Sequence, residues 1–250
     1  MNETHLKRAV DELFAAYRSG QQLEDLPASC RPSSIAEARQ IQDQLVERLG
    51  GHGGWKVAPI QPGVEPGCAP IPRERVLHSP ARWAFPGSAG LELEVEVAVS
   101  FARDLDGTAP IGPDEIRAAI AGLHPALEVV ASRFRDRASL PVFTTTADLQ
   151  NNGGLIAGPA TTDWQAIELD RLAIELLFDG RPAAKADSGA HRDSMLASLT
   201  WLANHARSRG KPLLRGQMVL TGARIKPTPV ERGVRVQARL NGLGTVELAT

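Results

Sequence analysis

Strict alternation of apolar and acidic residues marks residues 91–99 as a β-strand. Leu91, Leu93, Val95, Val97 and Val99 take the odd positions, and glutamates take positions 92, 94 and 96. Because successive side chains of a strand point to opposite faces, one face is apolar and the other carries three carboxylates. Glutamate is depleted in strands, and carboxylates two residues apart on one face lie roughly 7 Å from each other and repel. Either this face is solvated, as in many half-buried strands, or a divalent cation relieves the repulsion.

Residues 4–18 and 34–49 repeat their apolar residues at helical spacing. Ser34 is a suitable N-cap for the second helix, and glycines from position 50 onward end it. From 59 to 86, prolines and glycines recur with too little periodicity to predict an element, so we expect a long ordered loop or linker. The chain therefore divides into a helical region, 1–54, and a second region, 55–250.

The second region is richer in strand patterns than in helical patterns. Helices are predicted from Pro113 to about Gly122, and from a cap at Asp193 or Ser194 to Gly210. Strands are predicted at 124–130, 153–157, 172–178, 217–221 and 234–240, with a last strand ending near Ala249. Few helices without regular strand–helix alternation favour an α+β fold over a doubly wound sheet.

Composition narrows the function to small-molecule chemistry. The 250 residues are 42% hydrophobic and 23% charged with a net charge of -1, so we expect no nucleic-acid partner, which would need a basic surface. We also expect no membrane segment and no signal peptide, because no apolar run is long enough. Cys30 and Cys68 form no Cys-x-x-Cys pair, so we expect reduced thiols in a cytoplasmic protein.

Several motifs, taken in order, resemble the hydratase and decarboxylase branch of the fumarylacetoacetate hydrolase superfamily. They are Gly54-Trp55-Lys56-Val57, Leu93 to Ala98 with Arg103-Asp104-Leu105, Leu123 to Phe134, Ala147-Asp148 with Gly153, Trp201 to Asn204, and Val219 to Ala223. The resemblance covers residues 54–245. It implies a mixed, rolled β-sheet core with an N-terminal helical extension, a Mg or Mn ion, 2-keto acid substrates and a homo-oligomer.

The same resemblance implies the roles of individual residues. Glu94 and Glu96 match a pair of metal ligands and Glu128 matches the third, a set of hard oxygen donors that suits Mg or Mn better than zinc. Lys56 matches a residue that contacts the substrate, and Thr221 and Gly222 belong to a substrate-binding motif.

Three further side chains carry open alternatives. Asp148 matches an acidic residue beside the pocket and either transfers a proton or caps a turn. His124 is an acid or base, or a structural histidine, and the structural role is favoured. Glu92 has no counterpart in the motif, so we expect it to be solvated or salt-bridged.

The sequence also departs from the family pattern. The hydratases carry an aspartate in the loop after the lysine strand, whereas Pro66 to Pro70 contains no acid and Glu65 is the nearest one. The resemblance implies that Gly67 stands at the position of the lost acid. The asparagine that follows the motif aspartate is Leu149 here. Arg224 and Lys226 stand where the hydratases have small residues, and they either bind a second carboxylate of a diacid or are solvated cations.

These observations predict a metal-dependent hydratase of 2-hydroxydienoates or unsaturated 2-keto acids, active in the breakdown of aromatic compounds. Decarboxylation of a 2-keto diacid and hydrolysis of an acylpyruvate are the alternatives within the enzyme class, because a chelated enolate serves all three. A catalytically degraded relative, which binds a metal or keto acid or supports a related decarboxylase subunit, is the alternative outside it.

Overall fold

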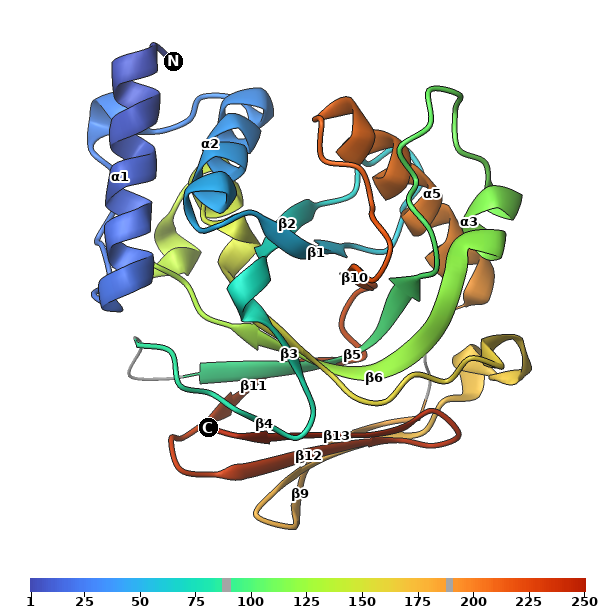
Figure 1. The fold of residues 1–250 in the computed structure, drawn as a ribbon. Helices are drawn as coiled ribbons and strands as arrows, with labels where there is room; N and C mark the ends of the chain where they lie inside the picture. The colour runs from blue at the N-terminus through green and yellow to red at the C-terminus, as the bar shows by residue number, and fades with distance from the viewer. Residues whose placement is uncertain (87–90, 188–190) are drawn as a thin grey trace.

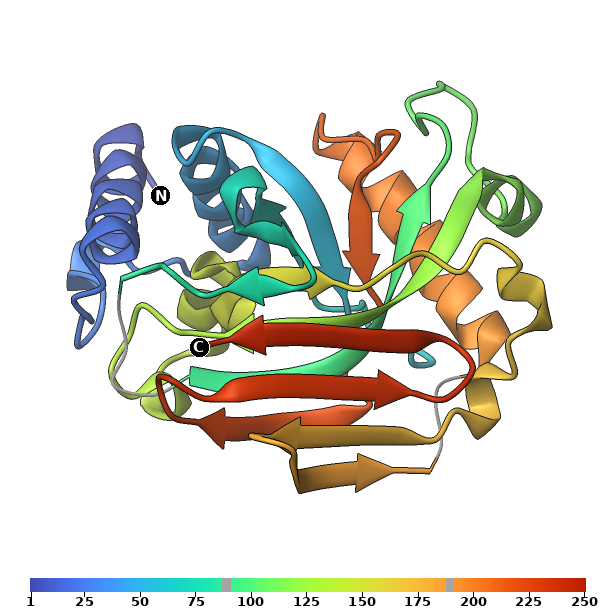
Figure 2. The same cartoon turned by 60° about the horizontal axis from the view of Figure 1, so that its bottom comes forward.

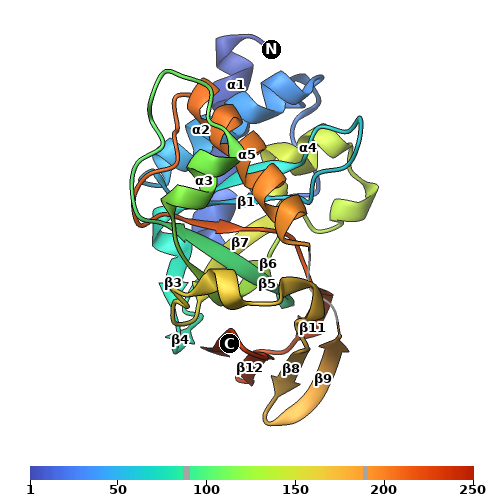
Figure 3. The same ribbon diagram turned by 90° about the vertical axis from the view of Figure 1, so that its right-hand side faces the viewer.

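Two β-sheets lie one above the other in the computed structural model, which describes residues 1–86, 91–187 and 191–250 (Figure 1). Helices gather around the larger sheet, and Figure 2 shows the strands of the smaller sheet beneath it. The N-terminus lies on the helical side and the C-terminus on the side of the smaller sheet (Figure 3). Mixed strand directions with few helices confirm the predicted α+β class.

The larger sheet has eight strands in the order β2-β1-β10-β5-β6-β7-β3, with β11 also paired to β5. These strands are β1 (His52–Val57), β2 (Cys68–Pro72), β3 (Val76–His78), β5 (Leu91–Phe101), β6 (Ile120–Val130), β7 (Asn152–Ala157), β10 (Met218–Leu220) and β11 (Ile225–Val230). The β1/β10 and β3/β7 pairs are parallel and the others antiparallel. Because β2 also contacts β7, far along the strand order, the sheet is curled as predicted.

The smaller sheet covers one face of β5 and β6. Its order is β4 (Ala81–Arg82), β13 (Gly244–Ala249), β12 (Arg235–Leu240), β8 (Ile174–Phe178), β9 (Arg181–Ala186). The five apolar residues at odd positions 91–99 are at most 1% exposed and share one hydrophobic cluster with Val236 and Val246. The apolar face of β5 is therefore the one buried against the smaller sheet, and its glutamates face the interior of the curled sheet.

The N-terminal helices α1 (Glu3–Ser19) and α2 (Ile35–Arg48) form a second hydrophobic cluster with Phe134, Ala147 and Leu149. The Ser34 hydroxyl accepts the Glu37 N–H at 3.2 Å, which confirms the predicted cap of α2. Three shorter or later helices complete the described chain: α3 (Pro113–Ala119), α4 (Val142–Ala147) and α5 (Arg192–Ser208). The division at 54/55 stays a prediction, and it falls inside β1.

Short 3₁₀ turns link the elements. They are η1 (Ala28–Cys30), η2 (Arg73–Arg75), η3 (Arg137–Ser139), η4 (Leu149–Asn151), η5 (Trp164–Ala166) and η6 (Leu169–Arg171). No helix within the described ranges combines the length and the apolar character that crossing a bilayer requires.

Several predicted boundaries were wrong. The segment 59–86 contains β2, β3 and β4, and the segment after Gly222 contains β11; both β2 and β11 carry prolines, which edge strands tolerate because one side of the backbone is unpaired. The helix from Pro113 ends at Ala119 because Ile120 already pairs with Phe101 in the sheet. Helix α5 begins at Arg192 with His191 as its N-cap, before the predicted caps.

Candidate metal centre

Three carboxylates meet on the interior face of β5 and β6. Glu94 lies directly opposite Glu128 in the antiparallel register, and Glu96 follows on the same face of β5. One oxygen from each of the three lies within 4.8 Å of the others. The structure thus brings together the residues that the sequence predicts as ligands, and metal binding itself stays a prediction.

Donors from three other elements surround this acidic cluster, Glu94, Glu96 and Glu128. Lys56 Nζ on β1 donates to Glu128 Oε1 at 2.6 Å, and Asn152 Nδ2 on β7 donates to the same oxygen at 2.9 Å. The backbone N–H of Gly222 donates to Glu96 Oε2 at 2.8 Å. Glu128 Oε2 is buried and has no hydrogen-bond partner among the residues described. One acceptor in the middle of the cluster is therefore left open.

Burial and mutual repulsion make the charged cluster unfavourable. Burial, followed by the Glu128 charge, raises the pKa of Glu94 to about 7 and that of Glu96 to about 8. Burial lowers the pKa of Lys56, but the three carboxylates more than offset this and the net shift is upward. Lys56 is thus a firmly protonated ammonium that neutralises one of three carboxylates.

The residues present fit a divalent cation. All three side chains offer hard oxygen ligands, and their separation allows one ion to contact all of them. Glu128 Oε2 has no hydrogen-bond donor among the described residues, so it is free to bind a cation. A cation there would also relieve the repulsion that raises the two pKa values. Within the described chain this is the one group of three or more acidic, histidine or cysteine side chains with such spacing.

Gly222 and Thr221, predicted to bind substrate, close one side of the cluster. Gly222 has φ = +98°, and a Cβ there would lie 2.7 Å from Pro59 Cδ, so no other residue fits without displacement. The Thr221 hydroxyl donates to the Val97 carbonyl at 2.8 Å. Gly222 therefore contributes its N–H to the site, Thr221 holds the backbone in place, and their contact with substrate stays a prediction.

A left-handed turn forms the opposite side. Leu149, Gln150 and Asn151 have φ of 51°, 50° and 61°, a conformation that residues other than glycine rarely adopt singly and almost never in succession. The turn directs the Gln150 carbonyl to Lys56 Nζ at 3.4 Å. The Gln150 side chain lies against Gly67, where an added Cβ would be 2.6 Å from Gln150 Nε2. An amide thus lies against Gly67, and the correspondence of Gly67 to the loop aspartate of the hydratases stays a prediction.

Sequence reasoning missed the parts played by Gln150 and Asn152. The available signal was the polar run Gln150-Asn151-Asn152 just before a buried strand, since buried amides need partners. Asn152 is fully buried, and its Oδ1 has no partner within the described part of the chain. Its amide orientation is set by Glu128, because a carboxylate repels a carbonyl oxygen and accepts an N–H.

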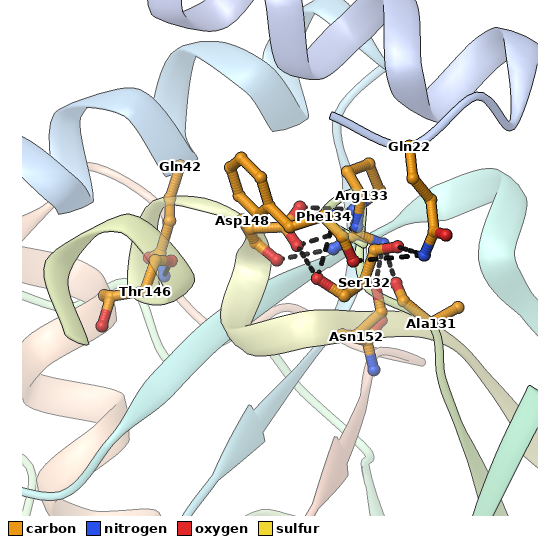
Figure 4. A network of polar contacts seen from close by, with 9 residues as sticks. All are labelled: Gln22, Gln42, Ala131, Ser132, Arg133, Phe134, Thr146, Asp148 and Asn152. Carbon is orange, nitrogen blue, oxygen red and sulfur yellow. Dashed lines mark hydrogen bonds and ion pairs between the residues drawn. The ribbon is translucent and has the colours of Figure 1, made fainter. Parts of the chain in front are cut away.

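Asp148 does not join the acidic cluster. Its carboxylate accepts the Ser132 hydroxyl and the Arg133 N–H, both at 3.0 Å, and it forms an ion pair with the Arg133 guanidinium (Figure 4). Burial raises the pKa of Asp148, and Arg133 opposes that rise. The side chain is therefore engaged outside the cluster, and its direct role in proton transfer stays a prediction.

The Arg133–Asp148 pair nevertheless connects to the cluster. Arg133 Nη1 donates to the Asn152 carbonyl at 2.7 Å, and the Asn152 side chain binds Glu128. On the other side, Gln22 Nε2 donates to the carbonyls of Ser132 and Phe134, at 3.2 and 3.1 Å (Figure 4). The N-terminal region is thereby joined to the segment that directly follows β6, the strand that carries the third carboxylate.

The contacts of Glu92 and His124 decide between the roles that the sequence left open for them. Glu92 forms an ion pair with Arg137, as expected. Both ring nitrogens of His124 are within 2.9 Å of oxygens, on Gly158 and Ser100, and burial lowers its pKa, which confirms a structural histidine.

The cations that depart from the family pattern differ in burial. Arg224 is partly buried and folds back on the Thr221 and Gly222 carbonyls beside Glu96, whereas Lys226 is exposed. Glu65, the acid nearest to Gly67 in sequence, pairs with Arg39 at 3.1 Å.

The curled mixed sheet and its acidic cluster agree with the family assignment made by comparison. Residues 64–249 match the model of the fumarylacetoacetate (FAA) hydrolase C-terminal family, and the chain belongs to that family. The curated relatives reported for its sequence are named as hydratases and a decarboxylase. The chain is 29% identical over 155 residues to a 2-keto-4-pentenoate hydratase of Paraburkholderia xenovorans, and 29% identical over 161 residues to a 4-oxalocrotonate decarboxylase of Pseudomonas. These matches cover 62% and 63% of this chain but only 57% and 60% of the relatives.

Solved structures share the fold, over the whole chain in one case and over part of it in another. 4-Oxalocrotonate decarboxylase from Pseudomonas putida G7, complexed with magnesium and adipate, superposes with a TM-score of 0.83 over 100% of this chain and 98% of its own, at 19% identity. Fumarylpyruvate hydrolase from Pseudomonas aeruginosa, in complex with Mn²⁺ and pyruvate, gives a TM-score of 0.54 over 78% of this chain and 87% of its own, also at 19% identity. At these identities the likeness establishes the fold.

Proposed function

We propose that the protein is a divalent-metal-dependent hydratase that adds water to 2-hydroxydienoates or unsaturated 2-keto acids such as 2-keto-4-pentenoate. The observation that carries the proposal is the acidic cluster with its open acceptor on Glu128, beside the partly buried Lys56. The names of the similar hydratases and of the metal-bound structural neighbours support it. We propose Mg or Mn as the ion and a homo-oligomer, as the resemblance implies, and a cytoplasmic location, as the two cysteines predict.

Each residue has a task in this scheme. Glu94, Glu96 and Glu128 would hold the cation, which would supply positive charge that stabilises the enolate of a bound keto acid. Lys56, kept protonated by its neighbours, donates hydrogen bonds to the negative charge that develops on the 2-oxygen while the hydroxyl proton of the dienol moves to a carbon of the same molecule and the 2-keto acid forms. Asn152 Oδ1 offers an acceptor for a proton-bearing oxygen of substrate or water. Water then adds its hydroxide and a proton across the carbon–carbon double bond, with no other product.

Decarboxylation of a 2-keto diacid is the second candidate, and one observation favours it. The position of the hydratase loop acid is Gly67, and the group that lies against it is the Gln150 amide, which neither gives nor takes a proton near neutral pH. Decarboxylation breaks the bond to the distal carboxylate, releases CO₂ and leaves the electron pair in the conjugated 2-oxo system. It therefore needs no group to activate water, and the same cluster serves it.

The test follows the ultraviolet absorbance of 2-hydroxypenta-2,4-dienoate with Mg or Mn, and CO₂ release from 4-oxalocrotonate in parallel. We expect metal-dependent loss of the dienoate in wild type and none in Glu96→Gln. Glu92→Gln is the matched control, because Glu92 lies on the same face of β5 but pairs with Arg137 outside the cluster. CO₂ release without dienoate loss would replace hydration by decarboxylation. Mn binding without turnover of either substrate, or of an acylpyruvate, would indicate the degraded relative.

A further inference from the structure

A small cavity away from the acidic cluster gathers basic and phenolic groups under helix α1. It measures about 30 Å³ and lies between α1, the turn at Arg75 and the loop after β6. Tyr17, Arg75, Trp83 and Arg133 are among its lining residues. At least ~10–15 Å³ is needed to admit one water, so the cavity has room for one or two waters or for one small ion.

Arg75 is a buried cation without an effective counter-charge. Only 5% of it is exposed, and its guanidinium carbon lies 3.7 Å from the centre of the Phe85 ring and 4.4 Å from that of Tyr17. Arg75 Nε has no hydrogen-bond partner in the described ranges. Aromatic faces attract a guanidinium, but they do not satisfy its N–H donors.

The nearby carboxylates are committed to other arginines. Glu74 Oε1 lies 3.9 Å from Arg75 Nε, beyond hydrogen-bond distance, and both Glu74 oxygens accept Arg18 Nη1 at 2.9 Å. Asp148 is paired with Arg133. Arg18, Arg75 and Arg133 thus share two carboxylates, and one positive charge is left over at Arg75, one of the two arginines that line the cavity.

Tyr17 adds a second unmatched donor. The Tyr17 hydroxyl is buried and has no partner among the described residues. Burial raises the pKa of Tyr17 to about 12, with the two arginines opposing, so the phenol keeps its proton near neutral pH. Donors without acceptors beside an uncompensated positive charge are the surroundings that an anion prefers.

We propose that this cavity binds a small monovalent anion, of the size of chloride, between the Arg75 guanidinium and the Tyr17 hydroxyl. One such ion supplies both the missing acceptor and the missing negative charge, whereas water supplies only the acceptor. Binding joins α1 to the sheet through Tyr17 and Arg75, so an occupied site stabilises the docking of the N-terminal helix. The site is independent of the proposed reaction.

Thermal unfolding of the full chain tests the proposal in sodium chloride, sodium formate and sodium gluconate at equal ionic strength. We expect a saturable rise of the melting temperature with chloride over gluconate, since gluconate is too large for the cavity. Arg75→Met should abolish the rise, and Tyr17→Phe should weaken the apparent chloride affinity by about tenfold, as loss of a hydrogen bond to a charged group does. Arg8→Met is the matched control, because that arginine is exposed on the same helix as Tyr17 and pairs with Glu12, and its chloride response should match wild type.

Formate distinguishes the source of the anion. A stronger response to formate than to chloride supports the same site with a carboxylate as its occupant. If Arg75→Met does not fold, Tyr17→Phe and a bromide-soaked crystal decide, and we expect an anomalous bromide peak between Arg75 and Tyr17. Equal melting temperatures in chloride and gluconate would overturn the proposal. So would a water in the cavity of the soaked crystal, or bromide that binds only at the concentration of the soak and has no effect in solution.

Discussion

Two groups of buried charge lie on either side of Asn152, and they are balanced in opposite ways. In the Arg133–Asp148 pair, Nε, Nη1 and Nη2 of the guanidinium all donate to oxygens, and the carboxylate accepts donors from both Arg133 and Ser132. In the acidic cluster, three carboxylates share one lysine. A network that satisfies itself within the chain serves the fold, whereas one that lacks a cation is built for a ligand.

Removing the guanidinium from the matched pair should have the largest effect. Arg133→Met leaves the buried Asp148 carboxylate unpaired and frees the carbonyl of Asn152, so we expect a loss of roughly 3–5 kcal/mol in the free energy of unfolding. Urea denaturation measures it. Arg135→Met, which removes an exposed pair with Glu24, should change stability little. A loss below about 1 kcal/mol at Arg133 would show that the pair is not structural.

Removing the lysine from the unmatched cluster should affect turnover and metal binding in opposite directions. Lys56→Met should lower kcat about 100-fold, because a positioned positive charge is lost from the site. The cluster becomes more negative, so Mn should bind at least as tightly, as measured by calorimetry. Exposed Lys226→Met is the control. A parallel loss of Mn affinity would mean that Lys56 only maintains the site.

Proton competition should make the cluster respond to pH. The pKa values of Glu94 and Glu96 are raised to about 7 and about 8, so a metal must displace protons below these values. Two protons are displaced below pH 7 and one between 7 and 8, so we expect Mn affinity to rise about a hundredfold per pH unit from about 5 to 7, about tenfold from 7 to 8, and to level off above 8. Calorimetry over this range measures it, and an affinity independent of pH would contradict the arrangement.

The stability of the metal-free protein should depend on pH in the opposite direction to the Mn affinity. Because the folded-state pKa values lie above the unfolded ones, the folded chain binds more protons. This contribution is complete below the ordinary glutamate pKa and is lost as pH rises through about 7 to 8. The melting temperature of the metal-free protein should therefore fall over that interval, and Glu96→Gln should reduce the fall.

Neutralising Glu94 should raise the stability, by less than the amount that Arg133→Met should lower it. Glu94 lies opposite Glu128, and like charges in that position are destabilising, so Glu94→Gln should stabilise the metal-free protein by about 1 kcal/mol while weakening Mn binding. Glu94 is preferable to Glu128 for this test because Glu128 holds both Lys56 and Asn152. Glu92→Gln should not stabilise, since it breaks the pair with Arg137.

Restoring the loop acid should have the smallest effect by itself. A Cβ at Gly67 would lie 2.6 Å from Gln150 Nε2, the end of a flexible side chain that has to move. Gly67→Asp alone should change stability by no more than about 1 kcal/mol. Combined with Gln150→Ala, it should raise the ratio of hydration to decarboxylation; an unchanged ratio would show that the loop acid does not decide the reaction.

The carboxylate site was predictable because its signals are local or carried by motif. Alternation along β5 fixes which face holds Glu94 and Glu96, and the motif around Glu128 indicates the third ligand. The sequence could not show that Asp148 turns towards Arg133, because that depends on the loop after β6. It also could not reveal β2 and β11, whose prolines are acceptable only because neighbouring strands leave them at an edge. The contacts of Gln150 depend on a backbone conformation that its residue type does not favour.

The left-handed turn has a consequence for mutational tolerance. At an ordinary site glycine is tolerated less well than alanine, because it adds freedom to the unfolded chain. At position 150, where φ is 50° and ψ is 43°, that order should be reversed, and β-branched residues should be the least accepted. A library of all single substitutions would then show a few consecutive positions, centred on Gln150, at which glycine and asparagine are enriched among folded variants. The turn would thus be detectable from variant frequencies alone.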